Sequence, residues 1–223
     1  ILGMKRSEKA WHLLADIGGT NARFAVEDVE ERSLKHAFTY SVAEYDSLIC
    51  VLKDFSTDVR KSSRWLDNPA KACLAVAATP ENETIKFTNS SWIFRRSEIS
   101  RLLGDISIQV INDFESIAKA IPYLSHQDFH KIGDCEFKFK GDNQVILGPG
   151  TGLGVAGLVS ADKGYKVISG EGGHVDFAPT NERELQIYKY LKTKFERVSV
   201  ERLLSGEVIT NIYAALSFHE SNN

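Results

Sequence analysis

Two glycine-rich turns have the residue types and spacing expected of phosphate-binding sites. The first follows the short apolar segment 12–16, and its candidate binding residues are Asp16, Gly18, Gly19, Thr20 and Asn21. Because glycine lacks a Cβ atom, the backbone can approach a ligand closely, and successive N–H groups can bind an anion. Asp16 ends the apolar segment, where a carboxylate could hold Mg²⁺ through water. An ordinary Gly-Gly hairpin turn is the alternative interpretation.

The second turn spans residues 148–154 and reads Gly-Pro-Gly-Thr-Gly-Leu-Gly, with Gly150, Thr151 and Gly152 at its centre. It lacks the Lys-Ser/Thr ending of a P-loop. It also leads into the strand-like segment 155–159, whereas a dinucleotide-binding turn opens into a helix. A glycine turn between two strands fits a phosphate held across a β-hairpin. Two such turns in one chain indicate phosphate binding more specifically than either turn alone.

Asn112 and Asp113 lie where a predicted strand ends and a predicted helix begins. Side chains at strand ends point into clefts, and Asp113 could bind a hydroxyl group and take its proton during a transfer reaction. Asn and Asp are also preferred helix N-caps, so a purely structural role is the alternative interpretation of both residues.

Two further carboxylates and a histidine occur in the second half of the chain. Residues 170–174 read Gly-Glu-Gly-Gly-His, which puts Glu171 and His174 on a loop of the kind that carries functional groups. Zinc binding is disfavoured because no cysteine or second histidine lies nearby in sequence, and a hydrogen bond to a polyhydroxylated ligand suits His174 better. Glu201 follows in the first turn of a short predicted helix, where compensation of the helix dipole or a solvated face is the alternative.

Strands and helices alternate along the chain, which predicts an α/β fold. The apolar periodicity predicts strands at 12–16, 21–29, 34–41, 72–78, 107–111, 144–147, 155–160 and 165–168. It predicts helices at 47–55, 97–104 with Ser97 as its cap, 114–121, 182–195 and from 209 to 216. The first three strands should pair antiparallel as two consecutive hairpins.

A strand-turn-strand opening occurs twice, near residue 12 and near residue 144, and this repetition predicts two related lobes. Pro122, Gly133 and Gly141 interrupt the pattern between them. We therefore expect a small lobe at 1–122 with the first phosphate turn and Asp113, and the beginning of a large lobe at 123–223 with the second turn.

The composition is that of a globular protein, with 223 residues, 43% hydrophobic and 26% charged. A net charge of −3 offers no basic surface for nucleic acid, and no run reaches the roughly 18 apolar residues that cross a bilayer. Three widely spaced cysteines and the lack of a signal-peptide core favour the reducing cytoplasm. Met4 is the expected natural start.

These segments together closely resemble the bacterial glucokinase family, a branch of the hexokinase–actin–Hsp70 superfamily. The matching stretches are LLADIGGTNARFAV (13–26), FTNSSW (87–92), INDFESIAKAIPYL (111–124), ILGPGTGLGVAGLV (146–159), GEGGHVDFAPTNERE (170–184) and VSVERLLSG (198–206). They cover nearly the whole chain in the family's order and spacing.

The resemblance implies a two-lobed actin-like ATPase (ribonuclease H-like) fold with mixed sheets. It also implies transfer of the γ-phosphate of ATP, with Mg²⁺, to the 6-hydroxyl of glucose, as in glycolysis. Asp113 would be the catalytic base, Asn112, Glu171, His174 and Glu201 would contact the sugar with it, and the two glycine turns would hold phosphate. The partners would be glucose and ATP, and a homodimer is one option.

The sequence departs from the family in stopping before its C-terminal part, so the second lobe is expected to be incomplete at the C-terminus. Two alternatives remain open at this point. One is a kinase of the same superfamily that acts on another hexose or an amino sugar. The other is a sugar-sensing protein that keeps the fold without turnover, against which the intact Asp113 and both phosphate turns argue.

Overall fold

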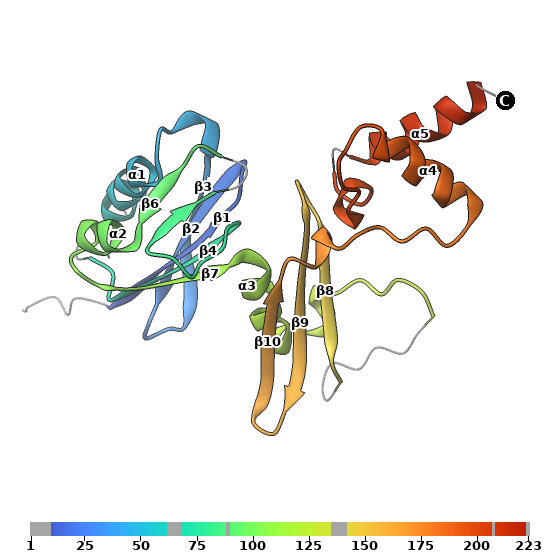
Figure 1. Ribbon diagram of the computed structural model, residues 1–223. Coiled ribbons are helices and arrows are strands. Elements are labelled where there is room, and N and C mark those ends of the chain that lie inside the picture. The colour runs from blue at the N-terminus through green and yellow to red at the C-terminus, as the bar shows by residue number, and fades with distance from the viewer. Residues whose placement is uncertain (1–9, 62–67, 88–89, 135–141, 207, 222–223) are drawn as a thin grey trace, which may run out of the picture. The chain divides into compact units, whose positions relative to one another are not determined.

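The computed structural model describes residues 10–61, 68–87, 90–134, 142–206 and 208–221 (Figure 1). The chain divides into two compact units, Ile1–Ser116 and Ile117–Asn223. The division falls within one helix, α3 (Asp113–Ala120). The assignment of residues 1–122 and 123–223 to the two lobes of an enzyme stays a prediction.

The first unit is built on a five-stranded mixed sheet in the order β3-β2-β1-β4-β7. Its strands are β1 (Trp11–Ile17), β2 (Asn21–Asp28), β3 (Ser33–Ser41), β4 (Lys71–Val76) and β7 (Ser107–Asn112). The first three pair antiparallel, as expected from the two hairpins, whereas β4 runs parallel to both β1 and β7. Alternate residues of β1 are buried, because successive side chains of a strand point to opposite faces.

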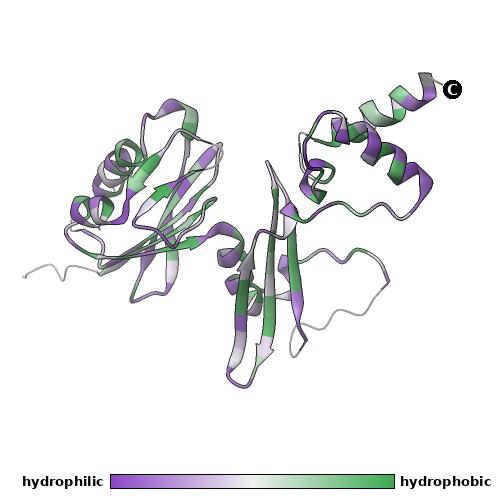
Figure 2. Ribbon diagram, viewed as in Figure 1, coloured by the Kyte–Doolittle hydropathy of each residue, from purple (hydrophilic) through white to green (hydrophobic). Residues whose placement is uncertain are grey.

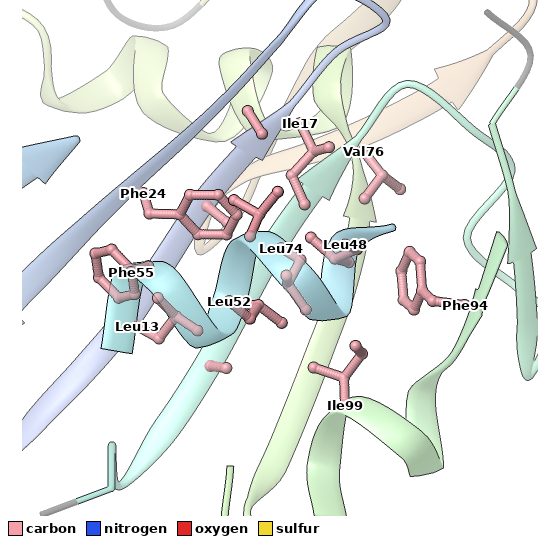
Figure 3. Packing of buried hydrophobic residues seen from close by; sticks show 14 of the residues in the cluster. Leu13, Ile17, Phe24, Leu48, Leu52, Phe55, Leu74, Val76, Phe94 and Ile99 are labelled. Atoms are coloured by element: carbon pink, nitrogen blue, oxygen red, sulfur yellow. The ribbon is translucent and has the colours of Figure 1, made fainter. Parts of the chain in front are cut away.

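A helix covers the core of this sheet. It is α1 (Leu48–Lys61), preceded by the short 3-10 turn η1 (Val42–Glu44), and its buried residues recur at the three- and four-residue spacing of one helix face. Figure 3 shows Leu48, Leu52 and Phe55 of α1 beside Leu13 and Leu74 of the sheet, all of them buried. Burying each such side chain contributes about 1.5–3 kcal/mol, so this contact fixes the helix on the sheet.

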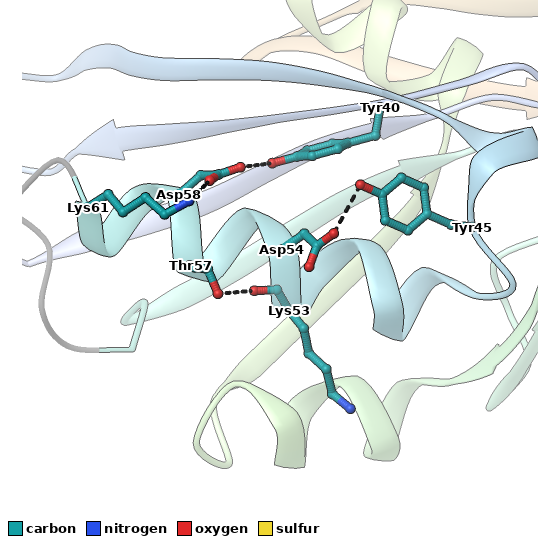
Figure 4. A network of polar contacts seen from close by, with 7 residues as sticks. All are labelled: Tyr40, Tyr45, Lys53, Asp54, Thr57, Asp58 and Lys61. Atoms are coloured by element: carbon teal, nitrogen blue, oxygen red, sulfur yellow. Dashed lines mark hydrogen bonds and ion pairs between the residues drawn. The ribbon is translucent and has the colours of Figure 1, made fainter.

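Polar contacts also tie α1 to the segment before it (Figure 4). The Tyr40 hydroxyl donates to Asp58 Oδ2 at 3.2 Å, and Lys61 Nζ lies 3.0 Å from Asp58 Oδ1. The Tyr45 hydroxyl donates to Asp54 Oδ2 at 3.1 Å. Burial, together with the negative charge of Asp58, raises the pKa of Tyr40, and the hydrogen bond from Lys61 holds the pKa of Asp58 below its usual range. The phenol is therefore a neutral donor to an ionised acceptor at neutral pH.

Two short strands and a helix complete the first unit. They are β5 (Thr84–Lys86), β6 (Ile93–Arg95) and α2 (Arg96–Leu102). The prediction that Ser97 caps α2 is wrong, because the helix begins at Arg96 and its N-cap residue is Arg95, which makes no side-chain capping bond. The backbone N–H of Ser97 instead donates to Glu83 Oε1 at 3.0 Å, so a side chain from the β5 strand region satisfies this helix donor.

The second unit contains the antiparallel sheet β10-β9-β8 and two helices. Its elements are η2 (Ile121–Tyr123), η3 (His126–Asp128), β8 (Gln144–Pro149), β9 (Leu153–Ala161), β10 (Gly164–Gly170), η4 (Gly172–His174), α4 (Glu182–Lys192), η5 (Val200–Arg202) and α5 (Ile209–Ser221). The turn between β9 and β10 ends at Gly164, whose φ of 103° favours glycine. Figure 2 shows apolar residues concentrated in the strands and polar residues in the connecting turns.

The α4 helix begins where its sequence provides a cap. Asn181 Oδ1 accepts the Glu184 N–H at 2.9 Å, and the Glu184 carboxylate accepts the Thr180 N–H at 2.7 Å. These hydrogen bonds from Thr180 lower the pKa of Glu184. Ile187 and Leu191 of α4 are buried in one cluster with Ala215 of α5, which packs the two helices together.

Candidate functional site

The first glycine turn joins β1 to β2 in the first unit. Residues 18–20 form the loop, and the Gly18 N–H donates to the Asn21 carbonyl at 2.9 Å. The Thr20 carbonyl accepts the Val42 N–H at 2.9 Å, which fastens the loop to the segment after β3. The hairpin interpretation of Gly18 and Gly19 is therefore correct as a description of the backbone, and it is compatible with phosphate binding because the turn remains short and carries small residues.

Asp16 lies next to this turn and faces a cation on the neighbouring strand. Arg23 is its direct partner in the β1–β2 register, and Arg23 Nη1 donates to Asp16 Oδ2 at 2.8 Å. Both side chains are more than half exposed, so the pair contributes little to stability. It does orient the Asp16 carboxylate and puts a positive charge beside the turn.

The pair Asn112–Asp113 occupies the junction of β7 and α3. Asn112 Oδ1 accepts the N–H groups of Phe114 and Glu115 at 2.9 Å and 3.2 Å, which is the geometry of an N-cap. Asp113 Oδ1 accepts the Phe114 N–H at 2.9 Å. Asn112 thus caps α3, and both side chains are held in defined positions by the start of the helix.

The parallel part of the sheet brings Asp16 and the Asn112–Asp113 pair to one edge. Ile17 pairs with Val76, and Val76 pairs with Asn112, so the three strands end in the same row. Only β4 separates β1 from β7, which puts their ends about 10 Å apart at the usual strand spacing. The carboxyl ends of parallel strands in α/β sheets are where ligands bind.

The second glycine turn joins β8 to β9 and matches the first in its place in the fold. Residues 150–152 form the loop, and the Gly150 N–H donates to the Gly152 carbonyl at 2.8 Å. The Gly150 carbonyl accepts the Gly206 N–H at 2.8 Å. Each turn thus links the first two strands of an antiparallel three-strand series, as the repeated pattern in the sequence predicts.

Glu201 lies against this second turn. Its Oε2 atom accepts the Leu153 N–H at 2.8 Å, and its Oε1 atom lies 3.4 Å from His174 Nε2. The Glu201 side chain is only 27% exposed, although it is charged. The structure therefore joins two of the predicted sugar-binding residues to the end of the predicted phosphate turn.

The loop that carries Glu171 and His174 packs closely on the start of β9. A Cβ atom on Gly173 would lie 2.2 Å from the Leu153 carbonyl oxygen, and one on Gly172 would lie 2.8 Å from Val155 Cγ1. The His174 N–H donates to the Glu171 carbonyl at 3.0 Å, so the loop folds back on itself. Glycine is required here by close approach, which explains the Gly-Gly pair between the two functional side chains.

A short antiparallel bridge holds Glu201 beside the loop. The Val200 N–H donates to the Val175 carbonyl at 3.0 Å, and the Phe177 N–H donates to the Val198 carbonyl at 3.0 Å. Arg197 spans the two segments, since its Nε lies 2.6 Å from Asp176 Oδ1 and its guanidinium also bonds the His174 carbonyl. The 3-10 turn η5 has Glu201 in its first turn, as expected from the sequence, and presents it toward His174.

The described residues contain no cluster of three His, Cys, Asp or Glu side chains that could hold a metal ion. Mg²⁺ in phosphate-transferring sites is commonly bound by one or two carboxylates, water and the phosphates themselves. A single carboxylate such as Asp16, at the edge of the sheet and beside a glycine turn, fits that requirement.

None of the helices described in the chain is long and apolar enough to span a membrane.

The sequence pattern of the Glucokinase family matches residues 13–223. The chain belongs to the glucokinase family. Asp113, both glycine turns and the Glu171, His174 and Glu201 group all lie within the matched region. The family accounts for the fold, which is α/β with mixed sheets of the actin-like kinase type, as the resemblance implied.

Individual relatives agree with this assignment. The chain is 40% identical to a glucokinase of Tolumonas auensis over 206 residues, which are 92% of this chain and 61% of that protein. A solved glucokinase from an Antarctic psychrotroph is 32% identical with a TM-score of 0.73, covering 95% of this chain and 65% of that one. A Balamuthia mandrillaris glucokinase solved in complex with glucose shares the fold, with 24% identity and a TM-score of 0.75 over 98% of this chain and 65% of that one. The chain thus spans less than two thirds of the length of these glucokinases.

Proposed function

We propose that the complete protein is an ATP-dependent glucokinase that forms glucose 6-phosphate and ADP. The observation that carries the proposal is the contact set of Glu201, which reaches His174 on one side and the Leu153 N–H at the phosphate turn on the other. The reacting hydroxyl of the sugar must lie close to the transferred phosphate, so the residues that bind the sugar must neighbour those that bind the phosphate. Family membership supports the same reaction.

The chemistry assigns Asp113 the role of general base. The 6-hydroxyl oxygen attacks the γ-phosphorus of ATP, the bond from that phosphorus to the bridging oxygen of ADP breaks, and the hydroxyl proton passes to the Asp113 carboxylate. The hydrogen bond from the Phe114 N–H fixes one carboxylate oxygen, which orients the group before reaction. A positioned base typically contributes about 10²–10⁴-fold to the rate.

The two glycine turns bind and orient the phosphates. Gly18, Gly19, Thr20 and Asn21 would contribute backbone and side-chain donors in the first turn, and Gly150, Thr151 and Gly152 in the second. Asp16 would hold Mg²⁺ through water, and this ion would neutralise charge on the transferring phosphate. Phosphoryl transfer depends mainly on such positioning and charge stabilisation.

Selectivity for glucose would come from Asn112, Glu171, His174 and Glu201, which offer both donors and acceptors to sugar hydroxyls. A sugar that lacks one of these hydroxyls leaves a polar group of the site unpaired, which costs affinity. We also propose a cytoplasmic location, since a reducing compartment suits the three widely spaced cysteines of the sequence. Glucose and ATP are the proposed partners, without nucleic acid or membrane. The molecular mass of the protein in solution would test whether it forms a homodimer.

The proposal is tested by a coupled assay for ADP release with the complete protein encoded by the gene. The assay compares glucose with mannose, galactose, fructose and glucosamine, each with ATP and Mg²⁺. The proposal predicts the highest kcat/KM for glucose. A preference for another sugar would replace glucokinase with a kinase for that sugar, and ligand binding without ADP release from any of them would point to a sugar sensor.

A further inference from the structure

The Glu201 carboxylate has two neighbours that the proposed reaction uses for different substrates. Oε2 accepts the Leu153 N–H at 2.8 Å, directly after the second phosphate turn. Oε1 lies 3.4 Å from His174 Nε2, which belongs to residues 171–175, called the sugar loop below. A carboxylate that accepts a backbone N–H makes a charge-assisted hydrogen bond, which is stronger than a neutral one. The position of Glu201 therefore depends on the turn as well as on the sugar loop.

Gly152 keeps the space that this arrangement needs. A Cβ atom at position 152 would lie 2.5 Å from Glu201 Oε2 and 3.3 Å from Glu201 Cδ. The obstacle is the end of a flexible side chain and not backbone, so the protein can accommodate a Cβ atom by moving Glu201 without unfolding. Gly150, in the same turn, is different, because a Cβ atom there would meet nothing within 4 Å.

Backbone hydrogen bonds also join the segment 200–206 to the phosphate turn and to the sugar loop. The Gly206 N–H donates to the Gly150 carbonyl at 2.8 Å, and the Val200 N–H donates to the Val175 carbonyl at 3.0 Å. The segment 200–206 is thus bonded to the phosphate turn at two points, through Glu201 and Gly206, and to the sugar loop at its start. A displacement of the turn is transmitted to Glu201 through these bonds.

We propose that Glu201 couples the sugar to the second phosphate turn, and that Gly152 is a positioning residue for sugar binding in addition to its expected place around phosphate. This inference rests on the proposed glucokinase function, because it takes glucose as the sugar. It predicts that sugar and nucleotide each raise the affinity for the other through one shared carboxylate, a reciprocity that linkage requires.

The test measures glucose affinity in the absence of any nucleotide, by calorimetric titration of the complete protein. Gly152→Ala should raise the glucose Kd by about 10–100-fold, because a carboxylate displaced by roughly 1 Å loses its alignment. The matched control Gly150→Ala should stay within about threefold of the unchanged protein, since its Cβ atom is accommodated freely. A role for Gly152 in phosphate binding alone would not alter nucleotide-free glucose binding.

A reciprocal measurement covers the case in which Gly152→Ala fails to fold. Glu201→Gln should weaken the binding of a non-hydrolysable ATP analogue in the absence of glucose by about threefold or more, because the Leu153 N–H loses its charged acceptor. Glu171→Gln is the control, since the described contacts of Glu171 include no bond to the turn, and it should leave analogue affinity unchanged.

The outcomes separate the two proposals. If the unchanged protein binds no glucose, both the glucokinase function and the coupling are refuted. If it binds and phosphorylates glucose while Gly152→Ala and Gly150→Ala have equal glucose affinities and Glu201→Gln leaves analogue affinity unchanged, only the coupling is refuted. A loss confined to Gly152→Ala, or to Glu201→Gln in the reciprocal titration, supports the coupling.

Discussion

The substitution Gly173→Ala gives the strongest structural test of the sugar loop. Gly173 is buried, and a Cβ atom there would lie 2.2 Å from the Leu153 carbonyl oxygen and 2.8 Å from Leu153 Cβ. The first of these obstacles is backbone, so no rotation of a side chain can relieve the overlap. Either the loop that carries Glu171 and His174 or the start of β9 must move.

The expected cost follows from the size of the overlap. Restoring an ordinary contact requires a backbone shift of roughly 1 Å, and forced overpacking of this kind costs about 1–3 kcal/mol. In a unit of about 100 residues each kcal/mol lowers the melting temperature by about 4–8 °C, so a decrease of at least ~4 °C is expected. The displaced loop should also raise the KM for glucose by tenfold or more, since about 1 Å of misplacement can cost ~10²-fold.

Calorimetry and the coupled kinase assay measure both effects. Gly170→Ala is the matched control at the end of β10, directly before the loop, because a Cβ atom there meets nothing within 4 Å and the residue has no positive φ. It should change stability by less than about 1 kcal/mol. Equal melting temperatures and equal KM values for the two variants would refute the packing argument for the Gly-Gly pair.

Two substitutions of Asn112 separate its roles as helix cap and sugar ligand, and one substitution of Glu184 tests a pKa shift. Asn112→Ala should lower the free energy of unfolding by about 1 kcal/mol, measured by urea unfolding, because the α3 N-cap is lost. Asn112→Asp should keep the cap but lose affinity for glucose, measured by titration, if the Asn112 amide donates to the sugar. Equal glucose affinities of Asn112→Asp and the unchanged protein would remove Asn112 from the sugar site. The pKa of Glu184 is lowered by its hydrogen bonds from Thr180, so the unchanged protein should be more stable than Glu184→Gln above pH ~4.3, with the advantage lost as the pH falls through the folded pKa. Urea unfolding at a series of pH values measures this difference, and an advantage that persists at low pH would contradict the argument.

Periodicity and turn residues predicted most of the elements correctly because each is long enough to show its pattern. The helix α1 has five buried residues on one face, and the hairpins carry clear glycine signals. The strands β5 and β6 were missed because three residues are too few to establish an alternation. The prediction that Ser97 caps α2 was wrong, because the Ser97 N–H is itself a donor of the first helical turn. Its acceptor is the side chain of Glu83, which is distant in sequence.

The candidate residues were found from sequence, but their contacts were not. The spacing of Glu171, His174 and Glu201 does not reveal that Glu201 also accepts the Leu153 N–H, since that bond joins residues 48 positions apart. Arg23 was missed as a partner of Asp16, although its position in β2, three residues after Thr20, could have predicted the pairing across the hairpin. Nothing in the sequence indicated that Arg197 joins two loop segments, because its contacts with Asp176 and the His174 carbonyl depend on a short bridge between those segments.

In the proposed reaction Asp113 takes the proton from the sugar hydroxyl, and Asp113→Asn removes that ability. Asparagine keeps an oxygen that can accept the Phe114 N–H, so α3 should stay intact, while the base is removed. Steady-state turnover of glucose with ATP should fall by about 10²–10⁴-fold while glucose still binds, whereas Glu98→Gln at an exposed position of α2 should behave like the unchanged protein. Undiminished turnover by Asp113→Asn would contradict the assignment of Asp113 as the general base.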